Sequence, residues 1–599
     1  MQCFRVVCTS VLAVTVSMAA CLPHGRAQAA PFAPTDAVHA GGAQPPGLAG
    51  AVLVATVAAL EGDNRTAGQA FGDAARLDPS RPNLLRQAFL YSALAGDGTA
   101  SQLAAQLPGQ AMAELVMGDD AVLAGRWAEA KAHYGRAPQD AMLAMLRPLL
   151  EAWSLAGDGQ VDAALSVLAP WTGAHATGEG GLGGYYAIHA ALIAEAAGQR
   201  QRADALYRTA LALSPGHDVF TTRALGHWLV GQGRRDEAVR LADRLIDALP
   251  GLSLARDGIV ASFGRPPATT PRQGLAQAYF FLSALIGQEA ARLADPSGRP
   301  VREEGMRDVQ MLLLRFALAL DHGFGQGRLM LSSLQSDAGQ PALARDTIDQ
   351  AAPDDPLSTI IRLQQARLDA ATDHSADAQQ ILTRLAREYP DQPQIWQMLG
   401  NLYSGRQDWN AAIAAFDRAV AVSGHLAGDG WTLLFERAVA YDRSGRWPQA
   451  QADLQRALDL APNEAMLLNY LGYSLVERSQ DLPKAEALLR RAVAIAPGDA
   501  AIRDSLGWAL VRQGRIADGL GLLEGAAEQT PEDPAVNYHL GVAYWQSGRP
   551  REAVSQWHMA ELLPGEASDA QKIRAALADA ARSGHEEPPP GQQIGQKKD

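Results

Sequence analysis

The sequence repeats one motif three times: Asn469-Tyr470-Leu471-Gly472-Tyr473, Asp504-Ser505-Leu506-Gly507-Trp508 and Tyr538-His539-Leu540-Gly541-Val542-Ala543-Tyr544-Trp545. The glycines of successive copies are 35 and 34 residues apart. A small residue follows each glycine after twelve or thirteen positions, an alanine comes seven positions later, and a proline closes the copy. These residues are Ala485, Gly519 and Ala553, then Ala492, Ala526 and Ala560, and finally Pro497, Pro531 and Pro564. A period of 34 residues with this pattern predicts paired antiparallel helices.

Helix packing explains the residue types in this pattern. A glycine or alanine at the eighth position of the first helix lets the second helix approach closely, and bulky side chains on the second helix fill the remaining space. We expect Leu489, Leu523 and Trp557 to fill it. The proline ends the second helix, because it lacks an amide proton and crowds the preceding turn. One pair cannot bury its apolar face alone, so neighbouring pairs must stack into a solenoid.

The period and its Leu-Gly, Ala and Pro positions resemble the tetratricopeptide repeat (TPR) family. This resemblance implies an all-α fold, a right-handed superhelical solenoid of antiparallel helix pairs. The same frame fits thirteen repeats along the chain. Their eighth positions are Ala55, Phe89, Gly118, Leu150, Ala191, Gly226, Ser332, Ala366, Gly400, Ala438, Gly472, Gly507 and Gly541.

The frame divides the chain into segments. They are a flexible leader at 30–47, N-terminal repeats at 48–250, an irregular helical pair with loops at 251–327, C-terminal repeats with a capping helix at 328–582, and a disordered tail at 583–599. In the irregular pair, helical patterns cover about 272–293 and 303–321. This pair is either one degenerate repeat with a long loop or a hinge between two halves of the solenoid.

The N-terminal sequence has two alternative interpretations, and both are export signals. In the first, residues 1–29 form a signal peptide with Arg5 before an apolar stretch and the small-x-small site Ala27-Gln28-Ala29 at its end. In the second, residues 1–20 form a lipoprotein signal, because Met18-Ala19-Ala20-Cys21 resembles a bacterial lipobox that would lipidate Cys21. Either reading predicts a periplasmic protein, and the second anchors it to the outer membrane.

Composition argues against several classes of function. The formal net charge of −13, without a basic stripe that includes aromatic residues, argues against nucleic-acid binding. All 3 cysteines lie within the first 21 residues, so the rest of the chain offers no disulfide or thiolate metal site. The 13 histidines lack metal-ligand spacing, and the glycine-rich segment 178–184 lacks the Lys-Ser/Thr end of a phosphate loop. We therefore expect no cofactor, no metal and no catalytic site: a binding protein, not an enzyme.

The TPR resemblance also implies where partner proteins bind. In this family, positions two, five, nine and twelve of each first helix line a concave groove. In the C-terminal repeats these positions hold aromatic, amide and acidic side chains, and aromatic rings often dominate binding energy. The predicted protein-binding residues are Gln397, Asn401, Phe435, Asn469, Tyr473, Asp504, Trp508, Tyr538 and Trp545. We expect no clamp for a C-terminal carboxylate, because these positions hold none of the lysines that such grooves use.

A finer resemblance covers about residues 460–575. The first two motif copies and the run Tyr544-Trp545-Gln546-Ser547-Gly548-Arg549 resemble the C-terminal repeats of proteobacterial envelope TPR proteins. That family includes outer-membrane lipoproteins that are adaptors of a periplasmic C-terminal-processing protease. The resemblance implies an envelope scaffold whose partner is a processing protease or a cell-wall hydrolase complex. The alternative is a structural assembly factor for exopolysaccharide or outer-membrane machinery.

Overall fold

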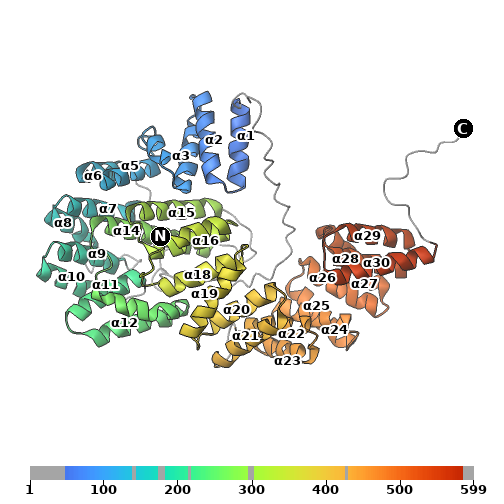
Figure 1. Cartoon of the computed structure of the whole chain (residues 1–599). Helices are drawn as coiled ribbons and strands as arrows, with labels where there is room; N and C mark the ends of the chain where they lie inside the picture. The colour runs from blue at the N-terminus through green and yellow to red at the C-terminus, as the bar shows by residue number, and fades with distance from the viewer. Residues whose placement is uncertain are drawn as a thin grey trace. The chain divides into compact units, whose positions relative to one another are not determined.

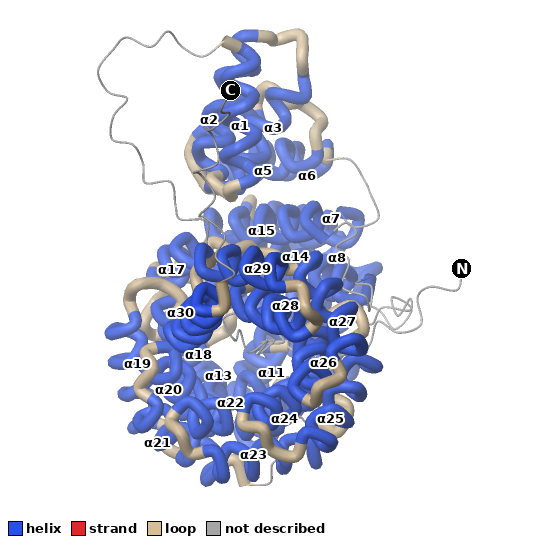
Figure 2. The backbone as a smooth tube through the Cα atoms, turned by 90° about the vertical axis from the view of Figure 1, so that its right-hand side faces the viewer, coloured by secondary structure: helices blue, strands red, loops and turns tan. Residues whose placement is uncertain are grey.

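The computed structural model describes residues 47–137, 143–172, 182–213, 218–293, 303–424 and 430–584. Every regular element in those ranges is a helix, and none is a strand (Figure 2). The predicted all-α fold is therefore confirmed. The predicted signal segments, Cys21, most of the leader, the loop between the irregular helices and the tail after Gly584 lie outside the described residues.

The chain divides into two compact units between Leu382 and Thr383, within α19. The first unit begins with six antiparallel helix pairs (Figure 1). They are α1 (Leu48–Leu60) with α2 (Asn64–Leu77), α3 (Pro82–Ala95) with α4 (Thr99–Ala104), α5 (Ala111–Leu123) with α6 (Trp127–Arg136), α7 (Leu143–Gly157) with α8 (Val161–Thr172), α9 (Gly183–Ala196) with α10 (Arg200–Leu213), and α11 (Val219–Gly231) with α12 (Arg235–Ala248).

The irregular stretch follows these six pairs and belongs to the first unit. It contains η2 (Pro250–Ala255), α13 (Arg256–Ala261), η3 (Ser262–Gly264), α14 (Pro271–Leu293) and α15 (Glu303–Leu320). One further pair is α16 (Gly325–Asp337) with α17 (Pro341–Asp349). Helix α18 (Ser358–Ala370) follows this pair, and α19 (Ser375–Glu388) contains the boundary between the two units.

The second unit consists of five more pairs and a final helix. The pairs are α20 (Pro393–Gly405) with α21 (Trp409–Val422), α22 (Gly430–Arg443) with α23 (Trp447–Leu460), α24 (Ala465–Glu477) with α25 (Leu482–Ile495), α26 (Ala500–Arg512) with α27 (Ile516–Gln529), and α28 (Pro534–Gln546) with α29 (Pro550–Leu562). The final helix is α30 (Ala567–Arg582).

Close contact between the two helices of a pair explains the glycine frame. A Cβ atom added to Gly507 would lie 2.8 Å from Cγ of Leu523, and one added to Gly541 would lie 2.4 Å from Nε1 of Trp557. Both distances are well below the optimal separation of about 3.5–4.0 Å for carbon atoms. The same contact joins Gly472 to Leu489, Gly400 to Phe416, and Gly118 to Tyr134. All thirteen predicted eighth positions are buried, which confirms the frame.

Helices α14 and α15 pack back onto the first helices of the N-terminal pairs. α14 lies on α7, and α15 lies on α3 and α5 (Figure 1). The hydroxyl of Tyr279 donates a hydrogen bond to the buried Asp119 carboxylate at 2.9 Å, and Arg315 Nε donates to the Leu94 carbonyl at 3.1 Å. The long helical pair therefore covers a face that the N-terminal repeats would otherwise expose.

Candidate functional site

The first helices of the C-terminal pairs form one surface, which we call the inner face. It comprises α20, α22, α24, α26 and α28, and α30 continues it after α29. Two ion pairs cross this surface. Arg443 at the end of α22 pairs with Glu566 before α30 at 2.7 Å, and Lys572 of α30 pairs with Glu477 at the end of α24 at 2.8 Å. The inner face is therefore concave, because these pairs join helices that are three or four repeats apart.

Four rings from three successive first helices form an aromatic cluster on the inner face. They are Tyr473 of α24, Trp508 of α26, and Tyr538 and His539 of α28. Trp508 stacks on His539, with ring centroids 4.3 Å apart and an interplanar angle of 16°. Tyr473 and Tyr538 lie 6.0 Å and 5.8 Å from the His539 ring. Trp508 and His539 are buried, whereas both tyrosines are half-buried, so the tyrosines form the accessible part of the cluster.

A carboxylate and an ammonium group border the aromatic cluster. Trp508 Nε1 donates a hydrogen bond to Oε1 of Glu477 at 2.8 Å, and Lys572 Nζ donates to its Oε2 at 2.8 Å. Burial alone would raise the pKa of Glu477, but the hydrogen bonds from Lys572 and Trp508 outweigh it and hold that pKa below its ordinary value. Glu477 is therefore ionised at neutral pH and presents a negative charge beside the rings.

A buried histidine–carboxylate contact lies behind the cluster. His539 Nδ1 and Asp504 Oδ2 are 2.8 Å apart, and their side chains are 2% and 7% exposed. Among the described residues, Oδ1 of Asp504 and Oδ1 of Asn469 are buried acceptors with no hydrogen-bond partner. Unpaired buried acceptors are costly. These two oxygens lie on the neighbouring first helices α24 and α26.

A second polar group lies where α20 meets α22. Gln397 Nε2 donates to Glu436 Oε2 at 2.7 Å, and Asn401 Nδ2 donates to Glu436 Oε1 at 3.1 Å. Burial raises the pKa of Glu436 above its ordinary value, although both hydrogen bonds oppose the shift. Two of the predicted binding residues therefore converge on a carboxyl group that the sequence pattern did not single out.

The structure corrects the expected exposure of three predicted binding residues. Phe435 is 2% exposed and packs edge-on against Tyr470, with centroids 5.3 Å apart. Trp508 is 4% exposed because His539 of the next repeat covers its ring. Asp504 is 5% exposed because it pairs with the same histidine. These three side chains hold neighbouring repeats together instead of lining an open groove.

The other predicted binding residues keep some access to solvent. Asn401 is exposed, and the half-buried ones are Gln397, Asn469, Tyr473, Tyr538 and Trp545. The structure brings Tyr473 and Tyr538 together in the aromatic cluster, while Trp545 lies beside Trp557 with ring centroids 5.7 Å apart. Their part in binding stays a prediction.

Four residues of the inner face were not predicted from the sequence: Glu436, Glu477, His539 and Lys572. Glu477 follows Tyr473 by four positions, so helical spacing alone places both on one face. Lys572 is one of three lysines within the described residues. No sequence signal pairs it with Glu477, because 95 positions separate them.

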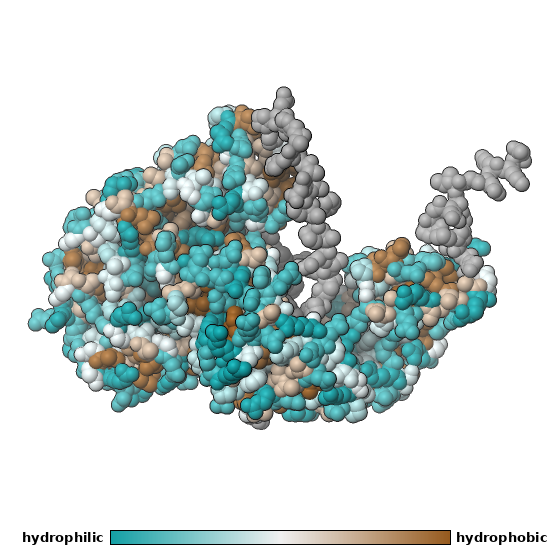
Figure 3. All heavy atoms as spheres, viewed as in Figure 1, coloured by the Kyte–Doolittle hydropathy of each residue, from teal (hydrophilic) through white to brown (hydrophobic). Residues whose placement is uncertain are grey.

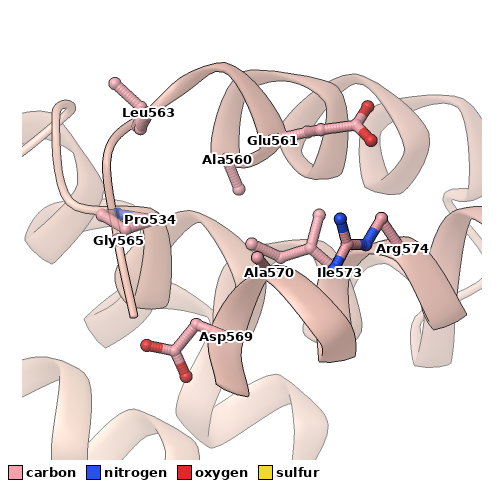
Figure 4. A pocket seen from close by; sticks show the side chains of 9 residues that line it. All are labelled: Pro534, Ala560, Glu561, Leu563, Gly565, Asp569, Ala570, Ile573 and Arg574. Carbon is pink, nitrogen blue, oxygen red and sulfur yellow. The ribbon is translucent and has the colours of Figure 1, made fainter. Parts of the chain in front are cut away.

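A cavity between the end of α29 and α30 has a volume of about 80 Å³ (Figure 4), far below the roughly 300–1,000 Å³ of ligand pockets.

Within the described ranges, no group of three or more potential metal ligands gathers. None of the described helices is both long and apolar enough to span a bilayer. On the visible face, hydrophobic residues form small scattered groups among hydrophilic ones (Figure 3).

Comparison with known proteins identifies the C-terminal repeats. Residues 363–427, 435–500 and 505–570 match the family model described as tetratricopeptide repeat. Repeats of this kind are typical of protein–protein interaction scaffolds, and the model describes a repeat rather than a catalytic domain. Comparison with curated proteins gives no significant match.

Several solved structures are similar to this chain. The Cut9–Hcn1 hetero-tetramer of the APC/C is 15% identical, with a TM-score of 0.37, over 88% of this chain and 96% of that chain. YrrB, a TPR protein with an unusual peptide-binding site, is 21% identical, with a TM-score of 0.25, over 32% of this chain and 97% of that chain. A tetratricopeptide repeat protein from Parabacteroides merdae is 13% identical, with a TM-score of 0.35, over 43% of this chain and 98% of that chain.

Proposed function

We propose that this chain, which carries tetratricopeptide repeats within residues 363–570, is a non-catalytic scaffold or adaptor that binds other proteins through its inner face. The aromatic cluster is the observation that carries the proposal. Aromatic rings bury much area for little loss of conformational entropy, and they are enriched at binding hot spots. Here Tyr473 and Tyr538 remain partly accessible, while Trp508 and His539 hold their surroundings in place.

The charges around the cluster restrict the kind of partner. Glu477 offers an ionised carboxylate beside the rings, and Arg443 offers a guanidinium group that is 47% exposed. A protein segment that carries an apolar stretch together with charged groups of both signs would complement this surface.

We further propose that the protein acts in the bacterial envelope. The support is the export-signal pattern of the N-terminus, with Cys21 as the lipidation site if the lipobox is used. The resemblance of the C-terminal repeats to envelope TPR adaptors favours a processing protease or a cell-wall hydrolase complex as the partner. An assembly factor for exopolysaccharide or outer-membrane machinery is the second candidate, because a long solenoid can contact several subunits at once.

Crosslinked pull-down from envelope extracts, followed by mass spectrometry, tests the proposal. The baits are the wild-type chain, Tyr538→Ala on the inner face, and Gln455→Ala on the exposed side of α23 as the matched control. We expect one partner to be depleted by Tyr538→Ala and retained by Gln455→Ala. Recovery of a protease favours the adaptor, and recovery of a synthase or secretion subunit favours the assembly factor. Equal recovery with all three baits contradicts binding through the inner face.

A further inference from the structure

Helix α30 and Glu566, the residue before it, place two charged groups on the inner face of the C-terminal unit. Lys572 bonds to Glu477 at 2.8 Å, and Glu566 accepts two hydrogen bonds from Arg443 at 2.7 Å and 2.8 Å. Neither contact is needed to continue the stack, since both reach past the neighbouring helix α28 to α22 and α24. The first part of α30 therefore occupies the charged edge of the surface to which we assign partner binding.

The attachment of α30 to the rest of the unit is slight. Only Ile573 and Ala580 of this helix are buried. Figure 4 shows Ile573 pointing toward α29 and Asp569 pointing away from it, with the cavity of about 80 Å³ left between the two helices. As the last helix of the solenoid, α30 has a neighbouring repeat on one side only. Its release would leave the contacts between the other repeats intact.

The ion pairs that hold α30 are also accessible to water. The Arg443 and Glu566 side chains are 47% and 55% exposed, and the Lys572 and Glu477 side chains are 38% and 23% exposed. Exposed pairs contribute little net stability and weaken as salt is added. An external segment that offers the same charges, together with more apolar contact to the tyrosines, can therefore displace α30.

We propose that α30 is an internal occupant of the partner site, and that the external partner is an amphipathic helix that presents a lysine or arginine to Glu477 and a carboxylate to Arg443. The contacts of α30 and Glu566 indicate this chemistry, because they show that Glu477 pairs with an ammonium group and Arg443 with a carboxylate. The inference rests on the proposed function, since it names the kind of segment that binds the inner face. It also makes partner binding competitive with docking of α30.

A binding experiment with the full-length chain tests this inference. The probe is a fluorescent peptide with the sequence of residues 566–582, and its affinity is measured by fluorescence anisotropy. The release variant is Glu566→Arg with Lys572→Glu, which reverses both charges that hold α30. The matched control is Asp579→Arg with Arg582→Glu, which reverses an exposed pair at the far end of the same helix. A third chain combines the release variant with Glu477→Gln.

We expect the peptide to bind the release variant at least about tenfold more tightly than it binds the wild-type chain or the matched control. In the third chain, Glu477→Gln should weaken peptide binding about tenfold relative to the release variant. Hydrogen exchange should accelerate in residues 567–582 of the release variant and stay unchanged in α28 and α29. Equal peptide affinity for the wild-type and release chains, including no binding to either, overturns the proposal. Unchanged exchange in α30 also overturns it. A pull-down that finds no inner-face partner, beside a positive peptide result, would instead count against the proposed function alone.

Discussion

Lys572 Nζ lies 2.8 Å from Glu477 Oε2, and the same carboxylate accepts a hydrogen bond from Trp508 Nε1. One carboxylate thus joins two first helices of the C-terminal unit, α24 and α26, to the final helix α30. Glu477 thereby connects Trp508, whose ring packs on the next repeat, to α30, the last helix of the solenoid. It places a fixed negative charge at the edge of the aromatic cluster.

Replacement of Gly507 by leucine should destabilise the C-terminal repeats. A Cβ at this position would already lie 2.8 Å from Leu523 and 3.1 Å from the Gly519 carbonyl oxygen, and overpacking of this kind costs about 1–3 kcal/mol. Gly521→Leu on the same pair is the control, because a Cβ there meets nothing within 4 Å. Hydrogen exchange should show lost protection in residues 470–560 for the first variant only. Equal protection in both variants would refute the assigned frame.

Trp508→Ala should cost folding stability directly, because the side chain is 4% exposed. Removing a buried tryptophan costs about 3–5 kcal/mol. Trp171→Ala, at a tryptophan that is 40% exposed, should cost clearly less. Denaturant unfolding measures the loss in free energy of unfolding for each variant. Hydrogen exchange then shows which of the two units is destabilised. An unchanged free energy of unfolding for Trp508→Ala would contradict the burial of its ring.

Glu436 should make the free energy of unfolding depend on pH. Burial raises its pKa in the folded chain above the ordinary value of 4.5, so its carboxyl is protonated in both states below that value. As the pH rises above 4.5, the unfolded chain ionises first. The free energy of unfolding should therefore fall between 4.5 and the raised pKa. In denaturant titrations at several pH values, Glu436→Gln should lose this slope, whereas Glu532→Gln at an exposed position should keep it. Parallel curves for wild type and Glu436→Gln would contradict the burial of an ionisable group.

The intact mass of the mature protein should report removal of the N-terminus. A chain that begins at Ala30 identifies cleavage by signal peptidase, and an acylated chain that begins at Cys21 identifies the lipoprotein. Cys21→Ser should abolish acylation in the second case and change nothing in the first. Recovery of a chain that begins at Met1 from the cytoplasm would contradict export in either form.

The features that sequence predicted are local ones. The spacing from Gly507 to Leu523, like that from Gly541 to Trp557, reports how closely two consecutive helices approach. A close approach forbids a side chain at one position and requires a large one about sixteen positions later. Such constraints leave a period in the sequence, so the helix pairs and their eighth positions can be predicted from the sequence alone.

The features that sequence did not predict depend on contacts between distant segments. Trp508 is buried because His539 of the next repeat stacks on its ring. The hydrogen bond between Tyr279 and Asp119 joins residues that are 160 positions apart. The curvature of the solenoid decides which distant helices meet, and curvature sums small rotations between repeats. A helix-position rule drawn from the family could therefore place residues such as Phe435 on the inner face. It could not tell which of them the next repeat would cover.

Site-specific photocrosslinking at Tyr538 tests the central claim most directly. The chain would carry benzoylphenylalanine at this position in living cells, and a second chain would carry it at Gln455 on the exposed side of α23. If the inner face binds partner proteins, light should produce a discrete adduct with another protein from Tyr538, and none or much less from Gln455. Adducts from Gln455 alone, or an absence of adducts from Tyr538 in cells that express the chain at its natural level, would contradict a binding role for the inner face.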